Sequence, residues 1–316
     1  MSATDDAGAN TVESAAAESV TTRAGFVALA GRPNVGKSTL TNAIVGTKVA
    51  IVSDRPQTTR RAIRGVVNGP DWQLVLVDLP GFQRPRDALT QRMASRVERE
   101  LDDADALLML LNGEERIGAG DRRIAQRLAR TGIPVTVALN KVDRLNRERQ
   151  AQALLDAAEI MPEGAELFPV SARTGAGVPA LVAHLAAQLP ESPFLYEPEQ
   201  RSDLALAERL AELIREQVLR RTFQELPHAV GVVVEAIEPD RGAKPLTRVE
   251  ALIWVETESQ KSIVVGHGGR MIKAIGSAAR RELERELDGR VHLALAVRVR
   301  RHWRGDDSLL DRLGID

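Results

Sequence analysis

The sequence has no cysteine among its 316 residues, and only 3% of its residues are aromatic. The missing thiols exclude disulfides, a thiol nucleophile and a cysteine-based zinc site. No apolar run approaches the ~18 residues of a membrane-spanning helix. The formal net charge of −1 gives no bulk attraction to nucleic acid, so any such binding requires a local basic patch. This composition fits a cytoplasmic globular protein of about two domains.

Changes in composition along the chain indicate five segments. The first 23 residues are rich in Ala, Ser, Thr, Asp and Glu but lack the basic start and apolar centre of a signal peptide, which favours a disordered tail. Three prolines among residues 190–198 oppose helix and strand formation and indicate a linker. The expected division is a tail at 1–23, a first domain at 24–190, a linker at 191–203, a second domain at 204–304 and a C-terminal tail at 305–316.

One stretch, GRPNVGKS at 31–38, fits the phosphate-binding pattern G-x-x-x-x-G-K-[ST]. It follows a short apolar run and precedes a predicted helix that Gly46 ends. The glycines let backbone N–H groups approach phosphate oxygens, and the start of the helix adds its positive end. We expect Lys37 to reach the β- and γ-phosphates and Ser38 to bind Mg²⁺. The predicted nucleotide-binding residues here are Gly31, Arg32, Pro33, Asn34, Val35, Gly36, Lys37, Ser38 and Thr39.

A second loop is expected to complete a magnesium site. Asp78 follows a strand predicted at 72–77 and opens the sequence Asp-Leu-Pro-Gly, which ends at Gly81. An aspartate at the end of such a strand holds Mg²⁺ opposite the serine of the phosphate-binding loop. This short pattern is common in loops, and its place after a phosphate-binding loop makes it informative.

Two further loops predict a guanine site. Asn140, Lys141 and Asp143 follow a strand predicted at 135–139. Asp143 offers two acceptor oxygens to the N1–H and exocyclic amine of guanine, a donor pair that adenine lacks. Asn140 is expected to bond the other edge of the base and tie loops together, while the Lys141 stem lies over the ring. After the next predicted strand, the backbone of Ser171, Ala172 and Arg173 is expected to contact the base.

The order of elements predicts the fold of both domains. In the first, strands alternate with helices, which indicates a mostly parallel sheet with its ligand at the carboxyl ends of the strands. One antiparallel pair is expected at 62–67 and 72–77. In the second domain the expected order is helix, strand, strand, loop, helix, strand, an α+β arrangement. The predicted helices and strands of that domain lie at 204–221, 229–237, 249–255, 270–287 and 291–299.

The loop of the second domain carries the pattern G-x-x-G, which clamps the backbone of single-stranded nucleic acid in KH domains. A plain turn would also match this pattern. A solvated surface would also account for the charged residues that follow it. Residues 270–304 hold ten Lys and Arg against four Asp and Glu, which favours a basic patch. The predicted RNA-binding residues are Gly266, His267, Gly268, Gly269, Arg270, Lys273, Arg298 and Arg300.

These motifs resemble a known family. The five G motifs of translation-factor-class GTPases are matched by GRPNVGKST at 31–39, PQTTR at 56–60, DLPG at 78–81, NKVD at 140–143 and SAR at 171–173. The segments at 214–235, 263–276 and 297–314 resemble the KH domain and C-terminus of the Era family of ribosome-assembly GTPases. The resemblance covers about residues 24–314. It implies an α/β P-loop GTPase domain followed by an α+β type II KH domain.

The resemblance implies a function as well as a fold. Era-like proteins bind GTP or GDP with Mg²⁺, hydrolyse GTP slowly, bind the 3′ end of small-subunit ribosomal RNA and act late in assembly of that subunit. Some associate with the inner face of the cell membrane, and we expect a monomer. Lys37, Thr59, Asp78 and Gly81 are the implied catalytic residues. Ser38, Thr59 and Asp78 are the implied Mg²⁺ ligands, with Thr58 as the alternative to Thr59. Asn34 matches an asparagine linked to K⁺ in related GTPases.

The sequence departs from the family pattern at three places. Phe82 stands where Ras-type GTPases keep a glutamine that orients water, which predicts slow intrinsic hydrolysis. Leu79 replaces the usual threonine, a mild change. His267 and Gly268 replace a more basic pair, so phosphate binding would depend more on the backbone and on nearby cations. Two alternatives stay open: a tRNA-modification or tandem-domain GTPase, and a nucleotide-gated RNA or membrane recruitment module with incidental hydrolysis.

Overall fold

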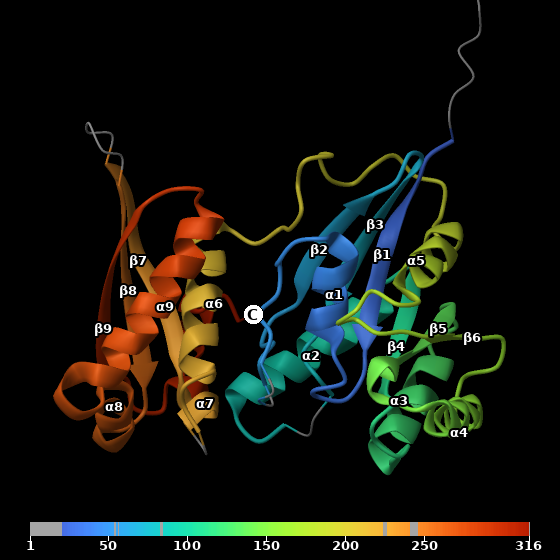
Figure 1. The fold of residues 1–316 in the computed structure, drawn as a ribbon, viewed down its shortest axis with the longest axis horizontal. Coiled ribbons are helices and arrows are strands. Elements are labelled where there is room, and N and C mark those ends of the chain that lie inside the picture. Colours follow the sequence, from blue (N-terminus) through green and yellow to red (C-terminus); the bar gives the residue numbers. More distant parts are fainter. Residues whose placement is uncertain are drawn as a thin grey trace, which may run out of the picture.

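The computed structural model describes residues 21–315, apart from 54, 56, 83, 84, 224, 225 and 241–245. The predicted tail at 1–23 lies outside the described residues except for its last three. The described chain forms two units that pack against each other, with the linker running along the first unit (Figure 1). None of the helices in this part of the chain has the length and apolar character that a membrane crossing requires.

A six-stranded sheet in the order β2-β3-β1-β4-β5-β6 forms the centre of the first unit. All neighbours pair in parallel except β2 and β3, which are antiparallel as predicted. The apolar runs of the sequence become central strands because helices cover both faces of the sheet. The strands are β1 (Arg23–Ala30), β2 (Ile63–Asn68), β3 (Trp72–Asp78), β4 (Ala106–Asn112), β5 (Val135–Asn140) and β6 (Glu166–Pro169).

Five helices cover this sheet and build two apolar layers. On one face α1 (Lys37–Val45) and α5 (Val178–Ala187) pack against the strands. On the other face lie α2 (Ala88–Asp102), α3 (Ala119–Ala129) and α4 (Arg147–Ala158). Sequence patterns did not predict α4, because only one of its residues is fully buried and its apolar stripe is therefore short.

A three-stranded sheet in the order β7-β8-β9 forms the second unit, with α6, α8 and α9 packed on one face. β7 and β8 are antiparallel, whereas β8 and β9 are parallel and are connected through α8 and α9. The order of elements confirms the type II KH fold. These elements are α6 (Leu206–Leu219), the short α7 (Leu226–Ala229), β7 (Gly231–Asp240), β8 (Leu246–Val255), α8 (Glu258–Val265), α9 (Arg270–Glu286) and β9 (Val291–Val299).

The predicted order of elements for this unit omitted one helix, because the stretch before the G-x-x-G loop forms α8. Thr257 begins α8 with a capping box, because its hydroxyl accepts from the Gln260 N–H at 3.2 Å. The Gln260 side chain in turn accepts from the Thr257 N–H at 3.3 Å. Such a pair satisfies N–H groups that have no partner at the start of a helix. The spacing of Thr257 and Gln260 was the available sequence evidence.

The proline-rich linker is bound to the first unit. Gln73 Oε1 on β3 accepts from the backbone N–H groups of Leu195 and Tyr196 at 2.7 and 2.9 Å. The Ser192 N–H donates to the Thr22 carbonyl at 3.0 Å. These contacts fix the path of the chain between the units, which limits how far they can separate without breaking hydrogen bonds.

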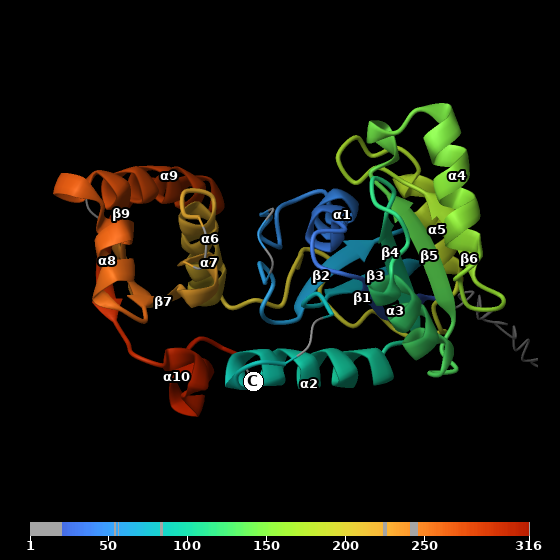
Figure 2. The same ribbon diagram turned by 90° about the horizontal axis from the view of Figure 1, so that it is seen from below.

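The C-terminal segment, expected to be a tail, forms α10 (Asp307–Arg312) and packs against α2 of the first unit (Figure 2). Arg92 on α2 donates to Asp307 at 2.8 Å, to Asp311 at 2.5 Å and to the Ile315 carbonyl at 2.6 Å. An apolar cluster closes the same contact and consists of Leu89, Met93, Trp303, Leu310 and Ile315. This contact therefore joins the C-terminal segment to the first unit at α2.

Replacing Trp303 with alanine tests this junction. The ring is fully buried, and its Nε1 donates to the Ala229 carbonyl at 3.0 Å. The change is expected to lower the free energy of unfolding by about 3–5 kcal/mol, measured by urea titration. Leu155→Ala on α4 is the control, because that side chain is 64% exposed and its loss should cost less than about 0.5 kcal/mol. A cost below about 1 kcal/mol for Trp303→Ala would contradict the docked arrangement.

Candidate functional site

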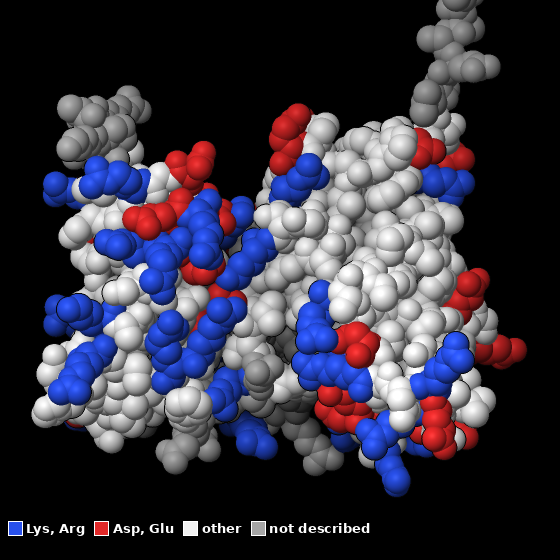
Figure 3. All heavy atoms as spheres, viewed as in Figure 1, with Lys and Arg blue, Asp and Glu red and all other residues white. Residues whose placement is uncertain are grey.

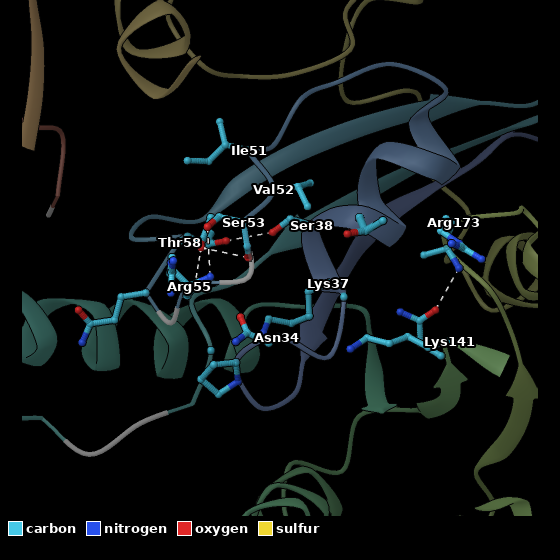
Figure 4. Close-up of a pocket in the computed structure, with 18 of the residues that line it drawn as sticks. Asn34, Lys37, Ser38, Ile51, Val52, Ser53, Arg55, Thr58, Lys141 and Arg173 are labelled. Carbon is cyan, nitrogen blue, oxygen red and sulfur yellow. Dashed lines mark hydrogen bonds between the residues drawn. The ribbon is translucent and has the colours of Figure 1, made fainter. Parts of the chain in front are cut away.

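A cavity of about 260 Å³ opens at the carboxyl edge of the six-stranded sheet. Four loops that are distant in the sequence meet there, after β1, β3, β5 and β6. Figure 4 shows Ser53, Arg55 and Thr58 on one side of Lys37, and Lys141 and Arg173 on the other. The predicted site residues that line it are Pro33, Asn34, Gly36, Lys37, Ser38, Thr39, Thr59, Gly81, Asn140, Lys141, Asp143 and Ala172.

Five predicted residues lie behind this lining: Gly31, Arg32, Val35, Asp78 and Ser171. The Arg32 guanidinium pairs with Asp121 on α3 at 2.9 Å and with Glu115, in the turn before α3, at 2.6 Å. The structure therefore does not bring the Arg32 side chain into the cavity. Its carbonyl contributes instead, because it accepts a hydrogen bond from Lys37 Nζ at 3.2 Å.

The phosphate-binding loop has the backbone that its glycines predict. Gly36 precedes α1 with a φ of 102°, and a Cβ there would lie 2.3 Å from Asn140 Nδ2, so only glycine fits. The first N–H groups of α1 consequently face the cavity at the positive end of the helix. Lys37 Nζ also donates to the Gly31 carbonyl at 3.2 Å, so its charge is held inside the loop.

A cluster of oxygen atoms lies beside Lys37. Ser38 Oγ donates to Asp78 Oδ2 at 2.6 Å, and Thr59 Oγ1 lies 3.0 Å from Ser38 Oγ. The Thr58 hydroxyl points elsewhere and donates to the Arg55 carbonyl at 2.6 Å. The structure thus separates two threonines that the sequence could not, and the hydroxyl of Thr59 is the one at the cluster.

The two charged groups at this cluster are fully buried, which shifts both pKa values. Burial lowers the pKa of Lys37 to about 8, although the nearby Asp78 carboxylate opposes this shift. Burial raises the pKa of Asp78 to about 6, against the opposing effects of Lys37, Ser38 and Thr59. Asp78 Oδ1 is buried and makes no hydrogen bond to any described residue. The arrangement can therefore accept an anion beside Lys37 and a cation beside Asp78.

Asn140 ties two loops together, as the sequence predicted. Its Nδ2 donates to the Val35 carbonyl at 2.9 Å, and its Oδ1 accepts from the Ala172 N–H at 3.0 Å. Both contacts are buried, so loss of this side chain would leave unpaired backbone groups. The amide fixes the distance between the phosphate-binding loop and the loop after β6.

Asp143 is held in place by two neighbours. The Ser171 hydroxyl donates to Asp143 Oδ1 at 2.6 Å, and Arg173 Nη2 lies 2.7 Å from Oδ2. The Ser171 hydrogen bond, and after it the Arg173 charge, hold the pKa of the Asp143 carboxyl below its usual value despite some burial. A carboxylate in this state can accept two N–H donors from one edge of guanine once Arg173 moves aside.

Some lining residues had no assigned role in the sequence analysis. They come from the segment after α1 and from the loop after β5, where polar and apolar types are mixed without periodicity. The residues in question are Ile51, Val52, Ser53, Arg55, Gln57 and Arg144. For Arg173 the sequence predicted a backbone contact to the base, whereas the structure places its side chain beside Asp143.

A second hollow, of about 360 Å³, lies between α9 and β9 of the KH unit. The Gly266–Gly269 loop forms a tight turn directly before α9, and His267 and Gly268 are exposed on it. Arg270 and Lys273 follow on α9, where both are exposed. Basic side chains gather on this face of the unit (Figure 3). The lining residues are Ile272, Lys273, Gly276, Ser277, Arg280, Leu293 and Leu295.

The structure does not bring Arg298 and Arg300 to this hollow. Successive residues of a strand point to opposite faces of the sheet. Leu295, Val297 and Val299 of β9 pack toward the helices, so the two arginines lie on the other face. Arg280 of α9 lies in the hollow instead, and the helical spacing of α9 was the available evidence for it.

Comparison with protein families and known proteins agrees with this geometry. The family model described as "50S ribosome-binding GTPase" matches residues 26–141, and the model described as "KH domain" matches residues 225–304. GTPase Era of Mycobacterium avium (strain 104) is 43% identical over 294 residues, which cover 92% of this chain and 98% of that protein. The chain belongs to the Era GTPase family. GTPase Era of Mycobacterium tuberculosis (strain ATCC 25618 / H37Rv) is also 43% identical, over 293 residues with the same coverage.

Two solved Era structures share the whole fold. One is Era in complex with MgGDPNP and nucleotides 1506-1542 of 16S ribosomal RNA, at 34% identity and a TM-score of 0.89. The other is a point variant of Aquifex aeolicus Era bound to GDP and AlF4⁻, at 33% identity and a TM-score of 0.88. Each match covers 93% of this chain and 99% of the other. The predicted Era-type GTPase with its C-terminal KH domain is confirmed.

Changing Asp143 to asparagine tests the base-side geometry. The asparagine amide has an NH₂ donor in place of one acceptor oxygen of Asp143. That donor faces an N–H donor of guanine, whereas xanthine offers it an acceptor oxygen. Affinity for GDP is expected to fall by about 100-fold, while affinity for xanthosine diphosphate rises. Fluorescence titration with both nucleotides measures this exchange. Asp156→Asn, on α4 and outside the lining of the cavity, is the control. Unchanged GDP affinity in Asp143→Asn would refute the assignment.

Proposed function

We propose that this chain is a GTP-controlled factor that binds the 3′ end of small-subunit ribosomal RNA and acts in assembly of the small ribosomal subunit. One observation carries the proposal. The cavity at the phosphate-binding loop and the hollow between α9 and β9 lie in one chain, and the segment beside the cavity contacts the KH unit. In that contact the Val52 N–H donates to Glu216 on α6 at 3.1 Å. A relative was solved with both MgGDPNP and 16S ribosomal RNA nucleotides. The proposed form is a monomer in the cytoplasm.

Magnesium fits the oxygen cluster at the cavity. Mg²⁺ prefers oxygen ligands, and Asp78 Oδ1 is buried without a hydrogen bond to the described residues. The hydroxyls of Ser38 and Thr59 and the carboxylate of Asp78 would hold the ion. When bound, Mg²⁺ neutralises charge between the β- and γ-phosphates. Lys37 would turn from its two carbonyl partners toward the same phosphates, while the backbone N–H groups at the start of α1 bind phosphate oxygens.

Hydrolysis by the chain alone is expected to be slow. Phe82 follows Gly81, and its ring packs partly buried among the side chains between the sheet and α2. A phenyl ring cannot orient an attacking water molecule. Lys37, Thr59, Asp78 and Gly81 are the proposed catalytic positions, acting by charge and by placement of the phosphates. Asn34, which is exposed at the cavity, is the proposed ligand of a K⁺ ion that adds positive charge there.

The proposed RNA surface is the hollow of the KH unit with the loop before it. Gly266, Gly268 and Gly269 of this loop have positive φ. The helix α9 begins directly after Gly269, and the N–H groups of its first turn can bind a phosphate. The first twelve residues of α9 carry Arg270, Lys273, Arg280 and Arg281 and no acidic residue. Apolar Ile272 and the leucines of β9 provide a floor on which bases can lie.

Single-turnover GTP hydrolysis distinguishes the proposed GTP-controlled switch from a second candidate function. In that alternative, which the missing glutamine favours, the chain is a recruitment module for RNA or for the inner face of the membrane, and hydrolysis is incidental. The switch predicts acceleration by about tenfold or more when ribosomal RNA 3′-end oligonucleotide is added, or when K⁺ replaces Na⁺. Asn34→Ala should remove the K⁺ effect alone. No acceleration by either addition would favour the recruitment module.

Magnesium binding should weaken in acid. The raised pKa of Asp78, about 6, means that below pH 6 its carboxyl holds a proton that the cation must displace. Affinity for GDP in Mg²⁺ is therefore expected to fall by up to about tenfold per pH unit below pH 6, and to level off above pH 7. Calorimetric titration across pH 5–8 measures it. The same series in EDTA reports titration of the nucleotide alone, and an equal slope in both series would contradict the prediction.

Charge reversal on the KH unit tests the RNA surface. Lys273→Glu and Arg280→Glu lie at the hollow, so each is expected to weaken binding of a 3′-end ribosomal RNA oligonucleotide by about tenfold and to reduce its salt dependence. Arg298→Glu makes the same charge change on the opposite face of the sheet and is the matched control. Fluorescence anisotropy at two salt concentrations measures all three. Equal losses in the three variants would mean that only net charge matters.

A further inference from the structure

Three consecutive residues beside the cavity are fixed from both units of the protein. The Thr58 carbonyl accepts a hydrogen bond from Arg215 Nη2 on α6 of the KH unit. Arg60 Nη1 donates to the Val230 carbonyl, also in the KH unit, at 2.7 Å. Between them the hydroxyl of Thr59 lies 3.0 Å from Ser38 Oγ, in the first unit. The position of Thr59 at the oxygen cluster is therefore bracketed on both sides by KH contacts.

Burial and an ion pair hold the Arg215 side chain in a fixed position. Its side chain is 3% exposed, and its guanidinium forms a two-point pair with Glu212, at 2.9 Å for Nε and 2.6 Å for Nη2. Such a planar fork fixes the direction of the remaining N–H donors. Burial alone would raise the pKa of the Glu212 carboxyl, but Arg215, Arg61 and Arg60 hold it below its usual value. The pair is thus charged as it meets the Thr58 carbonyl.

We propose that Arg215 is a positioning residue for the GTPase reaction, which acts across the interface between the units. By holding the Thr58 carbonyl it orients the next peptide and keeps the hydroxyl of Thr59 at the oxygen cluster. The inference rests on the proposed role of Thr59 as a magnesium ligand. Arg215 does not line the cavity and contacts the Thr58 carbonyl, so its effect passes through the backbone of one peptide.

This role predicts a selective defect. A threonine that reaches Mg²⁺ beside the γ-phosphate matters for the triphosphate state and not for the diphosphate state. Loss of Arg215 should therefore weaken binding of a GTP analogue more than binding of GDP, and raise the Mg²⁺ concentration that hydrolysis requires. A residue that only stabilises the interface would affect both nucleotides alike. Glu212 would keep Arg60 and Arg61 nearby in such a variant, so no buried charge loses all its partners.

The test is a double-mutant cycle on the full chain: wild type, Arg215→Met, Thr59→Ala and the double variant. Titration with a non-hydrolysable GTP analogue and with GDP, both in Mg²⁺, gives an affinity ratio for each. Arg215→Met is expected to lower the ratio of GTP-analogue to GDP affinity by about tenfold. In the Thr59→Ala background the same change should add less than about twofold. Arg215→Lys, which keeps the charge but loses the fork, should fall between wild type and Arg215→Met.

The matched control is Arg209→Met, because Arg209 lies on the same helix but pairs with Glu286 inside the KH unit, at 2.7 Å. It should leave the affinity ratio unchanged. If Thr59→Ala lowers the ratio and neither Arg215 variant does, the positioning role is refuted. If Thr59→Ala leaves the ratio unchanged, the proposed magnesium assignment fails instead. Should Arg215→Met not fold, Arg215→Lys decides, and a ratio within about twofold of wild type overturns the proposal.

Discussion

Residues 58–60 have partners in both units at the same time, and the relation between the units depends on this. The Thr58 carbonyl and the Arg60 guanidinium bond to the KH unit, whereas the Thr59 hydroxyl between them lies at Ser38. A chain segment this short cannot move toward a ligand without changing all three contacts. We therefore expect the occupancy of the cavity and the placement of α6 to be coupled, and such a coupling acts in both directions.

The second constraint is the pair of buried charges beside this segment. Burial lowers the pKa of Lys37 and raises the pKa of Asp78, so both charged forms are less favourable here than in water. A phosphate with its cation would relieve both costs at once, because each group would then face an opposite charge. Binding energy is thereby concentrated at the place where residues 58–60 are held. The site is most responsive to the charge of the phosphates, which is what differs between a triphosphate and a diphosphate.

Much of the fold and the nucleotide site could be predicted from the sequence, for a physical reason. Motif residues such as Asp78, Asn140 and Asp143 directly follow or end strands of a parallel sheet, and the carboxyl ends of such strands meet at one edge. Local pattern therefore determined position in space. The G-x-x-G loop before α9 was predicted in the same way, since it depends on the backbone of a few adjacent residues.

The parts that escaped prediction depend on contacts distant in the sequence. Thr58 and Thr59 are adjacent, and the hydroxyl that faces the cluster depends on contacts of residues 58 and 60 with the KH unit. α10 was expected to be a tail because its docking on Arg92 joins residues more than 200 positions apart. The alternation of side chains along β9 places Arg298 on the face away from the helices. The number of basic residues in 270–304 does not distinguish the two faces of that strand.

Coupling between the two sites is tested most directly by RNA affinity in the two nucleotide states. A labelled oligonucleotide with the 3′-end sequence of small-subunit ribosomal RNA would be titrated with the full chain, in Mg²⁺, with either a non-hydrolysable GTP analogue or GDP. If the cavity controls the KH unit, the oligonucleotide binds tighter by about tenfold or more with the GTP analogue than with GDP. Equal affinity in the two states would contradict the claim that the cavity controls the KH unit.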